Sequence, residues 1–338
     1  MKAAVLIGQG TFAVDDVPMP SADPGYVVLR VKYCGICGSD LHAAISGQLP
    51  TNTIMGHEFA GEIVRIGQGV EGWKVGDHVT SIPMMPCGQC EACQRQAYFE
   101  CAFLLLATIG LGQIPGAFAQ YVRVHPAMLF SIPPGVGFRE AALNEPLAVA
   151  VHAVRIAQIT ADTRVAIIGA GPIGLLALQC AKEAGTSAIY VIESAAARAA
   201  VAAELGADKV IDPNQSDVLN EIQQLTGRGA DVVLECAGAP NTLQQAIDMV
   251  KPGGRVILVG VSPEPVEIVP LILIAKQVSV QGLLGYEADD FRQAMRLLEQ
   301  GKIDATRLVT DIVPLDGVQE AFQSLANPEK QIKVLVEP

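Results

Sequence analysis

The sequence has few charged residues and no long hydrophobic run. Only 17% of its 338 residues are charged and 5% are aromatic, with a single Trp. A net charge of −12 and the lack of any Lys/Arg run argue against nucleic acids and anionic membranes as partners. The apolar run at the start is too short for a signal peptide, and the uncharged stretches 102–122 and 165–181 are interrupted by Pro and Gly. We therefore expect a cytoplasmic protein without a membrane span.

What the sequence does contain is apolar residues and cysteine. Half of the residues are hydrophobic, so a chain of this length can bury the cores of two domains. Eight cysteines are present, and disulfides rarely persist in the cytosol. Four of them have the spacing C-x2-C-x2-C-x7-C, which predicts a closed site for a structural zinc ion in a lobe at about 86–102. An iron–sulfur cluster and metal-free thiols are the alternatives. The four ligands would be Cys87, Cys90, Cys93 and Cys101.

The chain shows two different sequence patterns, one after the other. Up to about residue 145, short β-branched runs alternate with Gly and Pro, which predicts an irregular β-barrel domain. From there to about residue 282, apolar strands alternate with helices, which is typical of a parallel sheet covered on both faces. A helix and a closing strand complete the chain. The sequence therefore predicts an α/β protein with a doubly wound sheet.

A dinucleotide fingerprint opens the second region. The run "GAGPIG" supplies Gly169, Gly171 and Gly174 between an expected strand and an expected helix. These glycines would allow a tight turn, close approach of a pyrophosphate, and close packing of helix on strand. Glu193 ends the next strand, where a carboxylate binds the ribose hydroxyls of NAD and repels the 2′-phosphate of NADP. NAD is therefore expected, although the nearby Arg198 could accommodate a 2′-phosphate.

A second group of metal-binding residue types lies upstream. The runs "CGICGSDLH" and "GHEFAGEIV" contain Cys37, His57 and Glu58, and Glu145 lies where the β-rich region ends. Three protein ligands with an open fourth position make a catalytic zinc site. Taken singly, each residue is more simply a buried thiol, a loop histidine or a surface carboxylate. Together with the fingerprint and the four cysteines, they favour a catalytic metal.

These motifs resemble those of the zinc-containing medium-chain alcohol and polyol dehydrogenases. The resemblance rests on "CGICGSDLH", "GHEFAGEIVRIG", "VGDHV", the four-cysteine lobe, "EPLAVAVHAV" and "GAGPIG", and it covers the whole chain. It implies a GroES-like catalytic domain at 1–145 and 285–338, a Rossmann NAD-binding domain at 146–284, and a homodimer or homotetramer. It also implies two zinc ions per subunit and a small alcohol or ketone substrate.

The resemblance also implies residue roles. The catalytic zinc ligands would be Cys37, His57 and Glu58, with Glu145 binding the zinc directly or through its water. Ser39 and His42 would relay the alcohol proton. The coenzyme contacts would be Gly169, Gly171, Pro172, Ile173, Gly174, Glu193, Arg198, Val259, Gly260, Val261, Leu283 and Leu284.

Two departures from the family bear on the substrate and on assembly. Gly285 stands where sorbitol dehydrogenases carry an Arg, so the sequence favours a 2,3-butanediol type of enzyme acting on a vicinal diol or small polyol. Sorbitol and L-threonine dehydrogenases are the alternatives, and a non-catalytic nucleotide-binding relative is a remote one. The stretch 102–112 is unusually apolar and is expected either in a subunit interface or in the core.

Overall fold

The chain forms two compact units in the computed structural model, which describes residues 1–338 except 48, 86, 96–99, 105, 263 and 327–329. The first unit comprises Met1–Glu145 and Glu287–Pro338, and the second comprises Pro146–Tyr286. Residues 86 and 96–99 of the predicted zinc lobe, and residue 105 of the apolar stretch, lie outside the described residues. None of the helices in the described part of the chain is both long and apolar enough to span a membrane.

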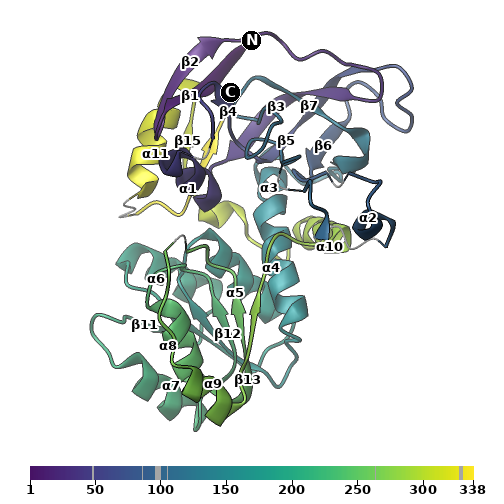
Figure 1. The fold of residues 1–338 in the computed structure, drawn as a ribbon. Helices are drawn as coiled ribbons and strands as arrows, with labels where there is room; N and C mark the ends of the chain where they lie inside the picture. The colour runs from purple at the N-terminus through teal and green to yellow at the C-terminus, as the bar shows by residue number, and fades with distance from the viewer. Residues whose placement is uncertain (48, 86, 96–99, 105, 263, 327–329) are drawn as a thin grey trace. The chain divides into compact units, whose positions relative to one another are not determined.

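The first unit is built mainly from antiparallel strands (Figure 1). One sheet has the order β2-β1-β4, and a larger one has the order β15-β16-β3-β5-β6-β8, with β7 also pairing with β3. Side chains such as Met55, Phe59 and Phe118 are fully buried in its core. The strands are β1 (Lys2–Gly8), β2 (Thr11–Asp16), β3 (Val27–Gly35), β4 (Thr53–Ile54), β5 (Glu58–Ile66), β6 (His78–Ser81), β7 (Tyr121–Val124), β8 (Leu129–Ser131), β15 (Val309–Val313) and β16 (Lys333–Val336).

Short helices connect these strands, and α1 (Gly38–Ser46) matters most for the site. Its N-terminus is closed by a reciprocal pair: the Cys37 side chain accepts the backbone N–H of Asp40, and the Asp40 carboxylate accepts the N–H of Cys37. It ends at Gly47, whose φ of 70° suits a residue without a side chain. The other helices are α2 (Glu91–Gln94), α3 (Phe138–Ala142), α10 (Ala288–Glu299) and α11 (Val318–Ala326), with 3₁₀ turns at Pro126–Met128, Thr306–Leu308 and Leu315–Gly317.

The second unit contains a six-stranded parallel sheet of order β11-β10-β9-β12-β13-β14. Its central strands are largely buried on both faces, which explains the apolar runs VAII, AIYVI and VVL within them. The predicted doubly wound α/β sheet is confirmed. The strands are β9 (Arg164–Ile168), β10 (Ala188–Ile192), β11 (Lys209–Ile211), β12 (Ala230–Glu235), β13 (Val250–Leu258) and β14 (Ser279–Gly282).

Helices cover both faces of this sheet. Right-handed connections place α5 and α6, which pack together, on one face, and α7, α8 and α9, which form a second packed group, on the other. Figure 1 shows α8 and α9 beside β13. Pro172 is the first residue of α5, a position where its missing N–H costs nothing. The helices are α4 (Asn144–Ile156), which begins in the first unit, α5 (Pro172–Glu183), α6 (Ala196–Leu205), α7 (Val218–Thr226), α8 (Thr242–Met249) and α9 (Pro270–Lys276).

Candidate metal centres and nucleotide-binding site

Three side chains in the first unit form what we call the buried donor group: Cys37, His57 and Glu58. One ligand atom from each lies within 4.8 Å of the other two. Cys37 follows β3 and precedes α1, whereas His57 and Glu58 stand at the start of β5. His57 is 5% exposed and Glu58 1% exposed, whereas Cys37 is only partly buried. One sulfur, one nitrogen and one oxygen donor at this spacing fit a zinc ion with an open fourth position.

Asp40 orients two members of the buried donor group. Its Oδ1 lies 3.2 Å from Nδ1 of His57, and its Oδ2 accepts the N–H of Cys37 at 2.9 Å. Burial lowers the pKa of His57, but the charge and hydrogen bond of Asp40, together with Cys37, outweigh it and hold that pKa well above its usual value. A carboxylate behind a ligating imidazole fixes which ring nitrogen faces the metal. Asp40 is not among the site residues predicted from the sequence, although it lies inside the motif "CGSD".

Lys333 reaches the same group from the last strand. Its Nζ donates to Oε2 of Glu58 at 2.5 Å and to the carbonyl of Ile36 at 2.9 Å. Burial lowers the pKa of Lys333, but the charges of Glu58 and Cys37 raise it by a larger amount. The net shift is therefore upward, and the ammonium stays charged. This residue was also missed. Its only signal in the sequence is a lysine inside the apolar run "IKVLV".

The other predicted catalytic residues lie at different distances from the buried donor group. Oγ of Ser39 is 3.4 Å from Nε2 of His57, so this hydroxyl borders the donors. His42 is exposed and lies one turn further along α1. Glu145 is 7% exposed in the first turn of α4. Its carboxylate is not among the ligand atoms that lie within 4.8 Å of one another.

The four cysteines of the lobe form a second group of possible ligands. Sγ of Cys93 lies 3.8 Å from Sγ of Cys87 and 3.4 Å from Sγ of Cys90, and Sγ of Cys101 accepts the N–H of Cys87 at 3.5 Å. Backbone N–H groups of Gln89 and Cys90 lower the pKa of Cys87 to about 6, whereas burial raises the pKa of Cys93 to about 12. Four thiols this close fit a tetrahedral zinc ion, which stabilises the thiolate form of each.

The apolar stretch after the fourth cysteine is divided between core and surface. Leu104 and Ile109 are buried, at 7% and 1% exposed, and Leu104 packs against the lobe cysteines. Phe103 and Leu106 are more than half exposed. Part of the stretch therefore belongs to the core, which is one of the two locations predicted for it.

The glycine fingerprint of the second unit has the geometry that its chemistry requires. Gly169 has a φ of 91°, which few residues other than glycine adopt. A Cβ on Gly174 would lie 1.9 Å from the carbonyl oxygen of Gly169, so only glycine lets α5 approach β9 this closely. Gly171 precedes α5, whose first N–H groups are available to an anion.

Glu193 is held beside this turn. Its two carboxylate oxygens accept the N–H groups of Ala170 and Ala195, each at 2.7 Å. Burial lowers the pKa of Arg198, and the charge of Glu193 partly opposes that shift, so the two side chains are neighbours. A guanidinium nitrogen of Arg198 also lies 4.0 Å from where a Cβ on Gly171 would stand. The two predicted determinants of coenzyme choice therefore flank the same turn.

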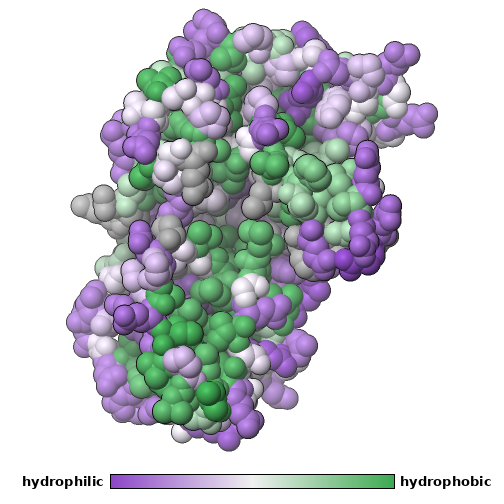
Figure 2. Space-filling view, viewed as in Figure 1, coloured by the Kyte–Doolittle hydropathy of each residue, from purple (hydrophilic) through white to green (hydrophobic). Residues whose placement is uncertain are grey.

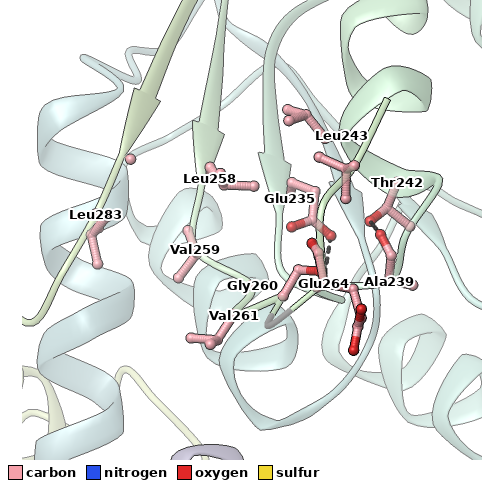
Figure 3. Close-up of a pocket in the computed structure, with 14 residues that line it drawn as sticks. Glu235, Ala239, Thr242, Leu243, Leu258, Val259, Gly260, Val261, Glu264 and Leu283 are labelled. Carbon is pink, nitrogen blue, oxygen red and sulfur yellow. Dashed lines mark hydrogen bonds between the residues drawn. The ribbon is translucent and has the colours of Figure 1, made fainter. Parts of the chain in front are cut away.

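A cavity of about 330 Å³ lies at the carboxyl ends of β12 and β13 (Figure 3). Four predicted coenzyme contacts line it: Val259, Gly260, Val261 and Leu283. Leu284 is not among the lining residues and is 62% exposed. Glu235 also lines the cavity and is not among the contacts predicted from the sequence. Its Oε1 accepts the N–H groups of Ala237 and Gly238, and its carbonyl accepts those of Val259 and Gly260.

Comparison with known proteins finds two domain families along the chain. Residues 23–134 match the GroES-like domain of alcohol dehydrogenases, and residues 172–300 match the zinc-binding dehydrogenase domain. The chain is 37% identical to (R,R)-butanediol dehydrogenase of Bacillus subtilis, with all of both chains covered. It is 36% identical to sorbitol dehydrogenase of the same organism, with 100% of this chain and 97% of that one covered. Among solved structures, a zinc-binding dehydrogenase from Sinorhizobium meliloti bound to NADP has a TM-score of 0.91 and 34% identity, with 100% of this chain and 99% of that one covered.

Proposed function

This chain belongs to the zinc-binding alcohol dehydrogenases, and we propose that it catalyses the reversible, NAD-linked oxidation of a secondary alcohol to a ketone, with a vicinal diol or small polyol as substrate. The observation that carries the proposal is the buried donor group of Cys37, His57 and Glu58 in a chain with a complete dinucleotide fingerprint. The similarity to a butanediol dehydrogenase supports the diol. Sorbitol is the first alternative, supported by the similarity to a sorbitol dehydrogenase, and L-threonine is the second.

In this proposal the buried donor group holds the catalytic zinc ion and the four-cysteine lobe holds a structural one. A bound zinc ion would supply a Lewis acid that lowers the pKa of a hydroxyl group. Because Nδ1 of His57 is hydrogen-bonded to Asp40, Nε2 is the ring nitrogen that would bind the zinc ion. Glu145 lies outside the donor group, so we assign it to the water or hydrogen-bond shell around the substrate rather than to the ligands.

Ser39 is the proposed acceptor of the alcohol proton. Its hydroxyl borders His57, and proton transfer needs a group within hydrogen-bonding reach of the reacting oxygen. His42 follows Ser39 by three residues on α1, so both side chains project from the same side of the helix. Because His42 is exposed, it is suited to release the proton to solvent.

The coenzyme assigned to this site is NAD. The Glu193 carboxylate is fixed by two backbone N–H groups and would repel a 2′-phosphate. The neighbouring Arg198 is the feature that would favour NADP, which is the coenzyme in the Sinorhizobium meliloti structure. We therefore expect a higher kcat/KM with NAD⁺ than with NADP⁺. Glu193→Ala should reduce the difference in kcat/KM between the two coenzymes.

A homo-oligomer is part of the same proposal. The last strand of the second unit's sheet, β14, is exposed along its whole length. Figure 2 shows hydrophobic side chains gathered on the second unit, where α8 and α9 lie. An exposed strand edge beside apolar side chains suits antiparallel pairing with a second copy about a two-fold axis. The exposed apolar residues include Ile268, Val269, Leu271, Ile274 and Val280.

Light scattering would test this interface. Ile274→Glu should shift the mass toward the monomer, whereas Val75→Glu, at a position in the first unit that is also more than half exposed, should not. Equal masses for both variants and wild type would place the interface elsewhere. The eight free cysteines agree with a reducing compartment, and we propose the cytoplasm.

The decisive experiment is a substrate screen with both coenzymes. NAD⁺ or NADP⁺ reduction would be followed with (R,R)-, (S,S)- and meso-2,3-butanediol, sorbitol, xylitol, L-threonine and simple 2-alkanols. The proposal expects the highest kcat/KM for one of the butanediols with NAD⁺. A preference for sorbitol or threonine would select an alternative. Elemental analysis should give two zinc ions per chain, and one zinc ion or iron would contradict the metal assignment.

A further inference from the structure

The carboxylate of the buried donor group, that of Glu58, also forms an ion pair with Lys333. Glu58 begins β5 and Lys333 begins β16, and β3 pairs with both of these strands. Their side chains are only 1% and 2% exposed. Water and salt therefore screen this ion pair little, so the ammonium acts on Glu58 at nearly full strength.

A glycine makes this contact possible. Gly35 in β3 lies opposite Glu58 in β5 and opposite Leu335 in β16. A Cβ on Gly35 would lie 2.1 Å from Oε2 of Glu58, closer than any real contact. The carboxylate thus crosses β3 through the space where a side chain would stand, and it meets Lys333 beyond it.

The charges of the site explain what this contact can do. The Cys37 thiolate and the carboxylates of Asp40 and Glu58 would carry three negative charges when a metal is bound. A zinc ion and the Lys333 ammonium carry three positive charges, so the site as a whole is balanced. Without Lys333, the same set would carry a net negative charge, and Glu58 would give its full charge to the metal.

We propose that Lys333 is a positioning residue that holds Glu58 by Oε2 and withholds part of its charge from the catalytic zinc ion. The metal would then retain more of its power to lower the pKa of a hydroxyl group. The zinc ion would also be bound less tightly than it would be if Glu58 had no ion pair with Lys333. This inference rests on the proposed catalytic zinc site.

The test is Lys333→Met, which removes the ammonium and keeps the length of the side chain. We expect the catalytic zinc ion to dissociate into a chelator about tenfold more slowly, and kcat to fall by about 10- to 100-fold. The visible spectrum of the cobalt-substituted site should shift, because Glu58 becomes a full donor. The melting temperature should fall more for the chelated protein than for the zinc-loaded one, since Glu58 then lies buried without a partner. The lobe zinc ion is the internal reference and should be released at the wild-type rate.

Three further variants separate this role from a purely structural one. Lys333→Arg keeps the charge and should retain the wild-type spectrum and most of kcat. Gly35→Ala pushes Glu58 away from an intact Lys333, and it should act in the same direction as Lys333→Met. Lys251→Met breaks a different ion pair, with Asp231 in the second unit, and should lower only the melting temperature.

The outcomes are distinguishable. If Lys333→Met does not fold, Gly35→Ala carries the test alone. Catalytic zinc released at the wild-type rate or faster, or an unchanged cobalt spectrum, would overturn the role of Lys333. A wild-type protein that binds only the lobe zinc ion would instead overturn the proposed function on which this inference rests.

Discussion

The four-cysteine lobe and the buried donor group are two metal sites of opposite construction. All four thiols of the lobe come from 87–101, and the hydrogen bonds to their sulfurs come from within 87–103. The buried donor group takes its ligands from the ends of two strands and is completed by Lys333, which lies 275 residues from Glu58 in the sequence. The lobe is thus a local structure, whereas the buried group is assembled by a sheet.

This difference predicts different roles for the two metals. A short segment with little core of its own gains its order from the ligands, so a zinc ion in the lobe contributes directly to folding. The buried donor group is held by β3, β5 and β16, by Asp40, and by the Glu58–Lys333 ion pair. Because the sheet positions these donors without a metal, losing that ion should change the chemistry more than the stability.

The largest effect is expected from Cys37→Ser. Removing one of three donors should reduce kcat by far more than the roughly 10- to 100-fold typical of losing an outer partner of a metal site. The zinc content should fall from two ions to one per chain, and the melting temperature should stay close to that of the wild type. Elemental analysis, a steady-state assay and a thermal melt check this. Retained activity with one zinc ion would show that the buried donor group is not catalytic.

Cys93→Ser should give the opposite result. Loss of a lobe ligand leaves three thiols and frees the segment, and a cost of a few kcal/mol would lower the melting temperature by roughly 5–10 °C. The remaining zinc ion should sit in the buried donor group, and the kcat per remaining zinc ion should stay near the wild-type value. An unchanged melting temperature would mean that the lobe is ordered without its metal, and the contrast between the two sites would fail.

The same contrast explains what the sequence could predict. The lobe spacing and the glycine fingerprint are local patterns, and the motifs around Cys37 and His57 are short, so all of them can be recognised without a structure. The alternation of apolar strands and helices was enough for the doubly wound sheet, which the structure confirms.

Interactions between distant segments could not be predicted in this way. Lys333 and Gly35 come next to Glu58 only because β3 pairs with β5 and β16, and no local sequence pattern predicts that pairing. Asp40 was missed for a different reason. In the sequence it looks like an ordinary acidic residue in the first turn of a helix, a position that aspartate favours whether or not a metal is nearby.

Asp40→Asn should have a smaller effect than the loss of a ligand. The amide keeps the shape of the carboxylate but loses the charge that orients His57, so the affinity for the catalytic zinc ion should fall by about 10- to 100-fold. The lobe zinc ion should be retained. Asp77→Asn is the matched control, because Asp77 also accepts a backbone N–H, that of Lys74. Equal zinc release from both variants would remove Asp40 from the metal site.

The smallest effect is expected from Glu145→Gln. Glu145 lies outside the donors that approach one another within 4.8 Å, so we expect it to act through a water or through the substrate. The neutral amide is a poorer hydrogen-bond acceptor, and kcat should fall by about tenfold, the lower end of the range for an outer partner. Zinc release into a chelator should match the wild type, because no ligand is lost. Glu145→Cys sharpens the test: a cobalt-substituted form that gains thiolate charge-transfer absorption would place residue 145 on the metal after all. Unchanged kcat in Glu145→Gln and an unchanged spectrum in Glu145→Cys would leave Cys37, His57 and Glu58 as the whole site.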